Sequence, residues 1–127
     1  MAVTATQKVC LIVDDSRPIR SVARCMLQQL GFATEEATNG HEALEVCRQR
    51  MPDMVLLDRN MPGLDGIGCV RALRALPGGH RPKVIFCTSE SSTDGIVEAI
   101  AAGANEYIMK PFDREILELK LAMAGAL

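Results

Sequence analysis

Short apolar runs alternate with amphipathic segments along the whole chain, and this alternation constrains the possible folds more than any other feature. Five apolar runs are typical of β-strands, and the segments that follow them place apolar residues at helical spacing. Four of the runs show little polar alternation, as in strands buried on both faces of a parallel sheet. The predicted strands are residues 8–13, 33–37, 53–57, 83–88 and 106–109. The sequence therefore predicts an α/β fold of five β-strand and α-helix pairs, (βα)5.

Turn and cap signals mark the ends of the predicted helices. The strand at 33–37 is polar, so we expect it at an edge of the sheet. Pro18 suits the first turn of a helix that Gly31 closes, and a later helix ends near Gly103. Apolar residues at helical spacing in the first, fourth and fifth helices are Ile19, Val22, Ala23, Met26, Leu27 and Leu30, then Ile96, Val97 and Ile100, then Ile116, Leu117, Leu119 and Met123.

Length and charge narrow the functional classes. The chain has 127 residues, so residues 1–127 are predicted to form one domain, with residues 1–7 as a disordered tail. The net charge is −2 with both signs interspersed, which argues against nucleic acid or an anionic membrane as a partner. The first seven residues lack the features of a secretory signal, and no apolar run approaches the roughly 20 residues of a membrane span. We therefore expect a cytoplasmic protein.

Several reactive or charged residues fit ordinary structural roles. The cysteines are odd in number and include no C-x-x-C pair, so we predict reduced core residues rather than disulfides or zinc ligands. His41 and His80 are expected at the surface. The cysteines are Cys10, Cys25, Cys47, Cys69 and Cys87. A loose basic group that we expect to be solvated comprises Arg71, Arg74, Arg81 and Lys83.

Chemically unusual residues lie at the carboxyl ends of four predicted strands, where open α/β sheets bind their ligands. Asp14 and Asp15 follow the first strand, Asp58 follows the third, Thr88 ends the fourth, and Lys110 follows the fifth. Right-handed crossovers bring the carboxyl ends of parallel strands to one edge of the sheet. If these strands are neighbours, three carboxylates, a hydroxyl and an ammonium group share one pocket.

Such a pocket suits a divalent cation and a phosphoryl group. Three carboxylates with one lysine carry excess negative charge, and an all-oxygen donor set favours Mg²⁺ over zinc. Magnesium is commonly completed by phosphate oxygens, and Lys110 would add a second positive charge. A carboxylate that is ionised at neutral pH can act as the nucleophile without a general base. The residues predict magnesium-assisted phosphoryl transfer to an aspartate, without indicating which one.

Four segments together resemble the receiver domain of two-component response regulators. They are "DD" (14–15), "DRNMPGLDG" (58–66), "CTSE" (87–90) and "EYIMKPF" (106–112), in the family's order and spacing and across essentially the whole chain. Among receivers, the chain is most similar to stand-alone CheY-like proteins, because it shares Asn60, Glu90 and Tyr107 at matching positions. The resemblance implies a doubly wound, flavodoxin-like sheet with strand order 2-1-3-4-5 and helices on both faces.

The resemblance also assigns the acceptor and the metal ligands. It implies that Asp58 accepts a phosphoryl group from a phosphohistidine of a partner kinase or histidine phosphotransferase. Asp15, Asp58 and the backbone carbonyl of Asn60 would bind Mg²⁺ directly. Asp14 would act mainly through a coordinated water molecule.

Further roles come from the same resemblance. Lys110 would hold a phosphoryl oxygen, and Pro111 would follow a cis peptide bond that aims this lysine into the pocket. Thr88 would donate its hydroxyl hydrogen to the phosphoryl group once that group is bound. Tyr107 would then turn inward into the space that Thr88 vacates.

The water that resets the switch would pass Asn60 and Glu90, so these two residues would tune the signal lifetime. Arg59, beside the acceptor, occupies a position that is often apolar in the family. A guanidinium there would lie at the pocket rim and attract a phosphodonor or change access to the site.

The expected function is a switch rather than a metabolic enzyme, because the chain would catalyse only its own phosphorylation and dephosphorylation. In the family, the responsive surface is the fourth helix, fifth strand and fifth helix, here about residues 94–126. We expect a monomer whose output is binding of a separate protein, with the flagellar motor switch as the first candidate. The alternatives are a phosphorelay or kinase-regulating receiver, and a phosphorylation-independent binding module that retained the fold. An enzyme of small phosphorylated metabolites is disfavoured, because the chain lacks an inserted cap.

Overall fold

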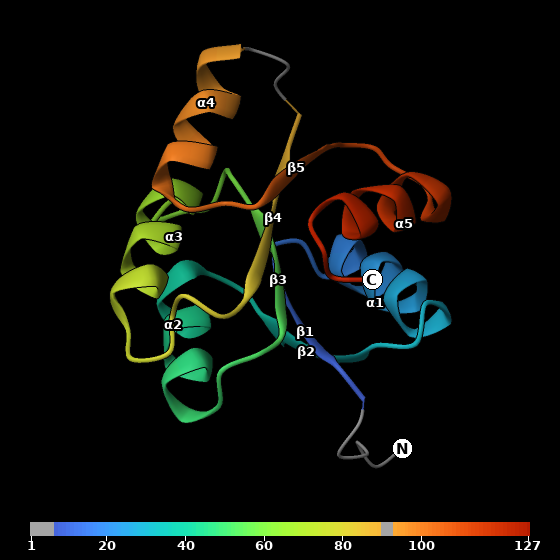
Figure 1. Cartoon of the computed structure of the whole chain (residues 1–127), viewed down its shortest axis with the longest axis horizontal. Helices are drawn as coiled ribbons and strands as arrows, with labels where there is room; N and C mark the ends of the chain where they lie inside the picture. Colours follow the sequence, from blue (N-terminus) through green and yellow to red (C-terminus); the bar gives the residue numbers. More distant parts are fainter. Residues whose placement is uncertain (1–6, 90–92) are drawn as a thin grey trace.

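A computed structural model describes residues 7–89 and 93–127 as a five-stranded parallel sheet between two helical layers (Figure 1). The strand order is β2-β1-β3-β4-β5, which confirms the expected topology. The strands are β1 (Val9–Val13), β2 (Ala33–Ala37), β3 (Met54–Asp58), β4 (Lys83–Thr88) and β5 (Glu106–Met109). The helices are α1 (Arg17–Gln29), α2 (Gly40–Gln49), α3 (Gly66–Ala75), α4 (Thr93–Ala102) and α5 (Arg114–Met123). The predicted tail falls almost entirely on residues 1–6, which lie outside the described residues.

Alternate residues of each central strand enter two separate cores, because successive side chains point to opposite faces of a sheet. Leu11 and Val13 of β1 pack in the core beneath α2, α3 and α4. Cys10 and Ile12 of the same strand pack in the core beneath α1 and α5. The strands β1 and β3 are buried at every position, which explains their continuous apolar sequences.

Both outer strands are less buried than the central ones. The polar strand β2 lies at one edge, as predicted, and only Ala37 of its five residues is buried. The strand β5 lies at the other edge, although its sequence was interpreted as that of a fully buried strand. Only Ile108 of β5 is buried, since β4 is its single neighbour in the sheet. Its apolar character reflects the helices that cover it rather than a central position.

Four helices begin at residues whose side chains cap the helix. These caps also hold the loops at the carboxyl end of the sheet. Ser16, Asn39, Asp65 and Asp113 each accept a hydrogen bond from the backbone N–H three residues later, at α1, α2, α3 and α5 respectively. These bonds satisfy amide groups that have no partner inside the helix. Three of these caps, Ser16, Asp65 and Asp113, lie at the ends of the predicted site segments 14–15, 58–66 and 106–112. The helices therefore begin where the site segments end.

The helical spacing identified α1, α4 and α5 correctly, but many of the spaced residues face solvent. The buried residues of α4 are small: Gly95, Ala99 and Ala102. In α5, Leu117 and Leu121 form the buried stripe. Exposed apolar side chains on these three helices are Ile19, Val22, Val97, Ile100, Ile116, Leu119 and Met123.

Two predictions about individual side chains need correction. Cys25 is exposed, whereas the other four cysteines are buried and all five are free thiols. Arg74 is not part of a solvated face: its guanidinium donates to the carbonyls of Gly79, Pro82 and Gly103 and to Asn105 Oδ1, at 2.8 to 3.0 Å. This side chain therefore ties the end of α3 to the segment between α4 and β5. Within residues 7–89 and 93–127, no helix has the length and apolar character to cross a membrane.

Gly66 is required by close packing against the end of β3. A Cβ atom at this position would lie 2.8 Å from the carbonyl oxygen of Asp58 and 2.8 Å from Cα of Arg59, both backbone atoms. We expect Gly66→Ala to lower the free energy of unfolding by about 1–3 kcal/mol, because backbone must move to make room. Urea denaturation followed by circular dichroism measures this change.

Gly68→Ala is the matched control in the same helical turn. Its nearest neighbour would be the flexible side chain of Leu64, so the substitution should cost clearly less than Gly66→Ala. Equal losses for the two variants would contradict the role of the backbone contact.

Candidate metal centre

Four strand ends bring the predicted site residues to one edge of the sheet. Asp58 and Thr88 are the last residues of β3 and β4, while Asp14 and Lys110 directly follow β1 and β5. Parallel pairing aligns these ends, since Asp58 lies opposite Cys87 and Thr88 lies opposite Met109. The predicted convergence is therefore confirmed by the strand order β1-β3-β4-β5.

Three carboxylates form the acidic part of the site. Asp14, Asp15 and Asp58 each place one carboxylate oxygen within 4.8 Å of the others. Asp14 and Asp58 are buried, at 4% and 7% exposure, whereas Asp15 is open to solvent. An all-oxygen cluster with one open side fits Mg²⁺, which prefers few protein ligands and retains water molecules.

Lys110 lies between the two buried carboxylates. Its Nζ atom is 2.9 Å from Asp14 Oδ2 and 3.1 Å from Asp58 Oδ1. The peptide bond before Pro111 is cis, as the resemblance implied, and the backbone N–H of Lys110 donates to the carbonyl of Thr88 at 2.8 Å. One ammonium group therefore serves two carboxylates, and the cluster as a whole keeps an excess of negative charge.

Burial and pairing act in opposite directions on the titration of these groups. Burial raises the pKa of Asp58, the nearby Asp14 raises it further, and the bonds from Lys110 and the Asn60 amide oppose the rise without cancelling it. Burial acts to lower the pKa of Lys110, but its contacts with Asp14 and Asp58 together outweigh burial and raise this pKa. The contacts therefore favour the charged form of Lys110, while burial disfavours the ionised form of Asp58.

Asp14 is fixed by contacts at both of its carboxylate oxygens. Lys110 donates to Oδ2, and the backbone N–H of Ser16 donates to Oδ1 at 2.8 Å. Ser16 is also the N-cap of α1, where its hydroxyl accepts from the amide of Ile19 at 3.4 Å. The sequence signal for such a turn is the aspartate itself, whose side chain commonly accepts from the backbone N–H two residues later.

Other predicted site residues lie around this centre. The backbone N–H of Asn60 is 3.4 Å from Asp58 Oδ1. Thr88 is buried at the end of β4, and Tyr107 is half-buried on β5 with the ammonium group of Lys120 at 4.1 Å from its ring centroid. The contact with Lys120 was not anticipated, because nothing in the sequence pairs these two positions. Glu90 lies outside the described residues.

A hollow of about 500 Å³ opens beside the carboxyl end of β3. Arg59, Asn60 and Glu98 contribute to its lining, and Arg59 is half-buried there. Arg59 therefore lines this hollow, and Glu98 of α4 supplies an opposite charge to it. A place for Arg59 at the rim of the acidic pocket stays a prediction.

Comparison with known proteins agrees with this arrangement. Residues 10–122 match the family model of the response regulator receiver domain. The chemotaxis protein CheY of Pseudomonas aeruginosa is 39% identical over 112 residues, which cover 87% of this chain and 90% of that protein. The structure of chemotaxis protein CheY4 of Vibrio cholerae has a TM-score of 0.89 at 32% identity and covers 94% of this chain and 99% of that chain.

A third similar structure contains the ion that the acidic cluster suits. It is the receiver domain of the sensor histidine kinase PA1611 of Pseudomonas aeruginosa, with a magnesium ion coordinated in its active site cleft. Its TM-score is 0.83 at 28% identity, and the match covers 94% of this chain and 99% of that chain.

Asp58→Asn is expected to raise the melting temperature in metal-free buffer at pH 7. The folded-state pKa of Asp58 is raised, so ionisation of this carboxyl destabilises the fold as pH rises through that pKa, and the penalty is still present at neutral pH. A neutral amide removes the penalty, and a gain of about 1 kcal/mol corresponds to a few degrees for a domain of this size. Thermal unfolding in EDTA measures the shift.

Glu118→Gln, which neutralises an exposed carboxylate on α5, serves as the control and should leave the melting temperature nearly unchanged. A lower melting temperature for Asp58→Asn would mean that the ion pair with Lys110 outweighs burial.

Proposed function

Because this chain belongs to the response regulator receiver domain family, we propose that it is a phosphorylation-activated switch whose acceptor is Asp58. The observation that carries the proposal is the position of Lys110 between Asp14 and Asp58 at the carboxyl edge of the sheet. This arrangement presents a buried carboxylate beside a fixed positive charge, where a transferred phosphoryl group is electrostatically favoured.

The proposed reaction is transfer of a phosphoryl group from a phosphohistidine to a carboxylate oxygen of Asp58. The phosphorus–oxygen bond forms as the phosphorus–nitrogen bond breaks, and the electron pair of that bond stays on the imidazole nitrogen, which takes up a proton. Lys110 holds a phosphoryl oxygen, and Thr88 donates its hydroxyl to another. Hydrolysis of the acyl phosphate by water restores the carboxylate, and Asn60 and Glu90 tune its rate.

Magnesium is the proposed cofactor. Asp15, Asp58 and the backbone carbonyl of Asn60 would hold the ion directly, and when bound it neutralises charge on the phosphoryl oxygens. The open position of Asp15 supports direct coordination by this residue. Asp14 would act through a coordinated water molecule, since both of its oxygens already accept hydrogen bonds from Lys110 and Ser16.

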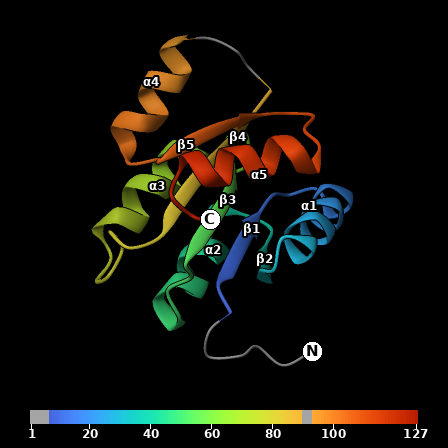
Figure 2. The same ribbon diagram turned by 45° about the vertical axis from the view of Figure 1, so that its right-hand side comes forward.

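The proposed output surface consists of α4, β5 and α5, within residues 94–126. Figure 2 shows the two helices on either side of β5. Val97 and Ile100 on α4, with Leu119 and Met123 on α5, expose apolar side chains there. Tyr107 on β5 would transmit the signal by turning inward when Thr88 moves toward the phosphoryl group. A partner protein would bind this surface in the phosphorylated state.

We propose a chemotaxis role for this switch, supported by the similarity to CheY proteins, with a flagellar motor switch protein as its target in the cytoplasm. The chain would act as a monomer and turn over no small-molecule substrate. The similarity to a receiver of a sensor histidine kinase supports a second candidate, a receiver that serves a phosphorelay or regulates a kinase.

Asp58→Asn is expected to abolish phosphorylation while leaving the fold intact. Its amide is a poor nucleophile, so transfer from acetyl phosphate or from a phosphorylated kinase should fall below detection. Phosphate-affinity electrophoresis measures the modified fraction, and circular dichroism checks the fold. Asp65→Asn, at a helix cap that the amide can still serve, should be phosphorylated like the unaltered chain. Labelling that persists in Asp58→Asn would mean that the acceptor is another residue.

Partner capture with and without beryllofluoride tests the output. Beryllofluoride stands in for the phosphoryl group on Asp58, so the magnesium-loaded protein should retain purified flagellar motor switch protein only when it is present. Asp58→Asn provides the control, since it removes the oxygen to which beryllium binds. Equal retention of a kinase or phosphotransferase in both states would favour the relay. Retention of a partner independent of both beryllofluoride and Asp58 would favour a phosphorylation-independent module.

A further inference from the structure

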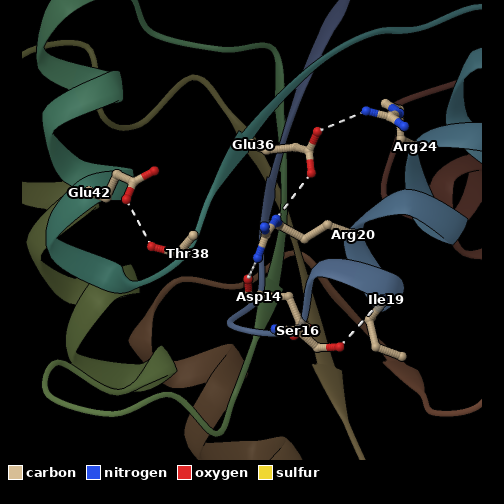
Figure 3. Close-up of polar contacts among 8 residues, drawn as sticks. All are labelled: Asp14, Ser16, Ile19, Arg20, Arg24, Glu36, Thr38 and Glu42. Carbon is tan, nitrogen blue, oxygen red and sulfur yellow. Dashed lines mark hydrogen bonds and ion pairs between the residues drawn. The ribbon is translucent and has the colours of Figure 1, made fainter.

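Arg20 links the turn that carries the acidic pair to the outer strand of the sheet (Figure 3). Its Nη1 atom donates to the backbone carbonyl of Asp14 at 2.7 Å, and its Nε atom donates to Glu36 Oε1 on β2 at 3.0 Å. The Arg20 side chain is only 11% exposed. A buried guanidinium with two fixed acceptors has a defined position, because its donors form a rigid planar fork.

The second carboxylate oxygen of Glu36 is bonded by another arginine of α1, Arg24. Arg24 Nη1 lies 3.2 Å from Glu36 Oε2, so each carboxylate oxygen of Glu36 accepts from a different arginine of α1 (Figure 3). Within the part of the chain that the structure describes, Arg24 has polar side-chain contacts with Glu36 alone, and 44% of its side chain is exposed. The two arginines thus share one partner, but only Arg20 reaches the acidic turn.

The contact from Arg20 completes the fixation of Asp14. The backbone N–H of Asp14 donates to Ala37 on β2 at 3.2 Å, and its carboxylate accepts from Ser16 and Lys110. The remaining acceptor is the backbone carbonyl, which Arg20 occupies. That carbonyl shares a rigid peptide plane with the N–H of Asp15, so holding it also sets the direction in which Asp15 leaves the turn.

We propose that Arg20 is a positioning residue of the metal centre, which holds Asp14 and Asp15 close to Asp58 before the cation arrives. Three carboxylates whose oxygens lie within 4.8 Å repel one another, and a loose turn would relax by moving Asp15 away. The Glu36-anchored guanidinium opposes that relaxation through the backbone. This inference rests on the proposed function, because it takes Mg²⁺ as the ion of the cluster.

Magnesium affinity tests the proposal, because the two possible effects of removing Arg20 change this affinity in opposite directions. Removal of a nearby positive charge alone would make Mg²⁺ bind more tightly. Loss of positioning makes it bind more weakly, and loss of an outer partner of a metal site typically weakens affinity about tenfold or more. Amide chemical shifts followed during Mg²⁺ titration give the dissociation constant for each variant without any phosphodonor.

Arg20→Ala is expected to raise the magnesium dissociation constant about tenfold. Arg20→Lys, which keeps the charge but loses the planar fork, should raise it by a smaller factor and provides the test if the alanine variant does not fold. Arg24→Ala is the matched control and should stay within twofold of the unaltered chain. Melting temperatures in EDTA verify that each variant is folded at the temperature of titration.

Each outcome separates the two proposals. Magnesium binding by the unaltered chain with equal or tighter binding by the folded Arg20 variants would overturn the positioning role alone. An equal loss of affinity in Arg24→Ala would also overturn it, since the effect would then come from Glu36 or from surface charge. No magnesium binding by the unaltered chain would overturn the proposed function together with this inference.

Discussion

The structure of the site depends on one ammonium group shared by two buried carboxylates. Asp14 and Asp58 come from strands that are neighbours in the sheet, and Lys110 reaches both from the far side of β4. Without the lysine, two like charges in a poorly solvated position would carry a large penalty. With it, three clustered carboxylates still face one ammonium group, and burial outweighs the lysine contacts in raising the pKa of Asp58. A divalent cation is complementary to that residual negative charge.

The fold supplies this geometry through the sheet edge and its loops. Parallel strands deliver their last residues to the same side, and the helix caps end the connecting loops within a few residues. Gly66 allows α3 to begin in direct contact with the backbone of Asp58. Asp58 is therefore held next to the core beneath α3, while Asp15 stays open to water.

Sequence reasoning recovered what depends on strand periodicity and strand ends. The alternation of elements and the side on which parallel strands end placed Asp14, Asp58, Thr88 and Lys110 at one edge of the sheet. The strand order that makes them converge came from the resemblance to receiver domains. Sequence reasoning failed to separate buried from exposed apolar residues on helices that carry both. In α5, Leu117 and Leu121 form one stripe and Ile116, Leu119 and Met123 another, and spacing alone does not reveal which stripe faces the core.

Sequence reasoning also missed the contacts of long side chains with distant backbone carbonyls. Arg20 and Arg74 resemble ordinary surface arginines in sequence, yet each bonds carbonyls that only the folded chain brings within reach. The strand β2 was expected at an edge because its sequence is polar, and the structure shows that Glu36 of this strand also bonds Arg20. No spacing rule links position 36 to the acidic pair at positions 14 and 15.

The small buried residues of α4 have a mechanical consequence. Gly95, Ala99 and Ala102 remove little apolar surface from water, so this helix adheres to the sheet less strongly than α3, which buries Ile67, Val70 and Leu73. At its carboxyl end, however, Arg74 clamps the carbonyl of Gly103 with two donors at 2.8 and 3.0 Å. The Arg74 contacts therefore anchor α4 at its carboxyl end, while its packing on the sheet depends on small side chains. A shift of this helix would give up little buried apolar surface, so its position costs less to change than that of α3.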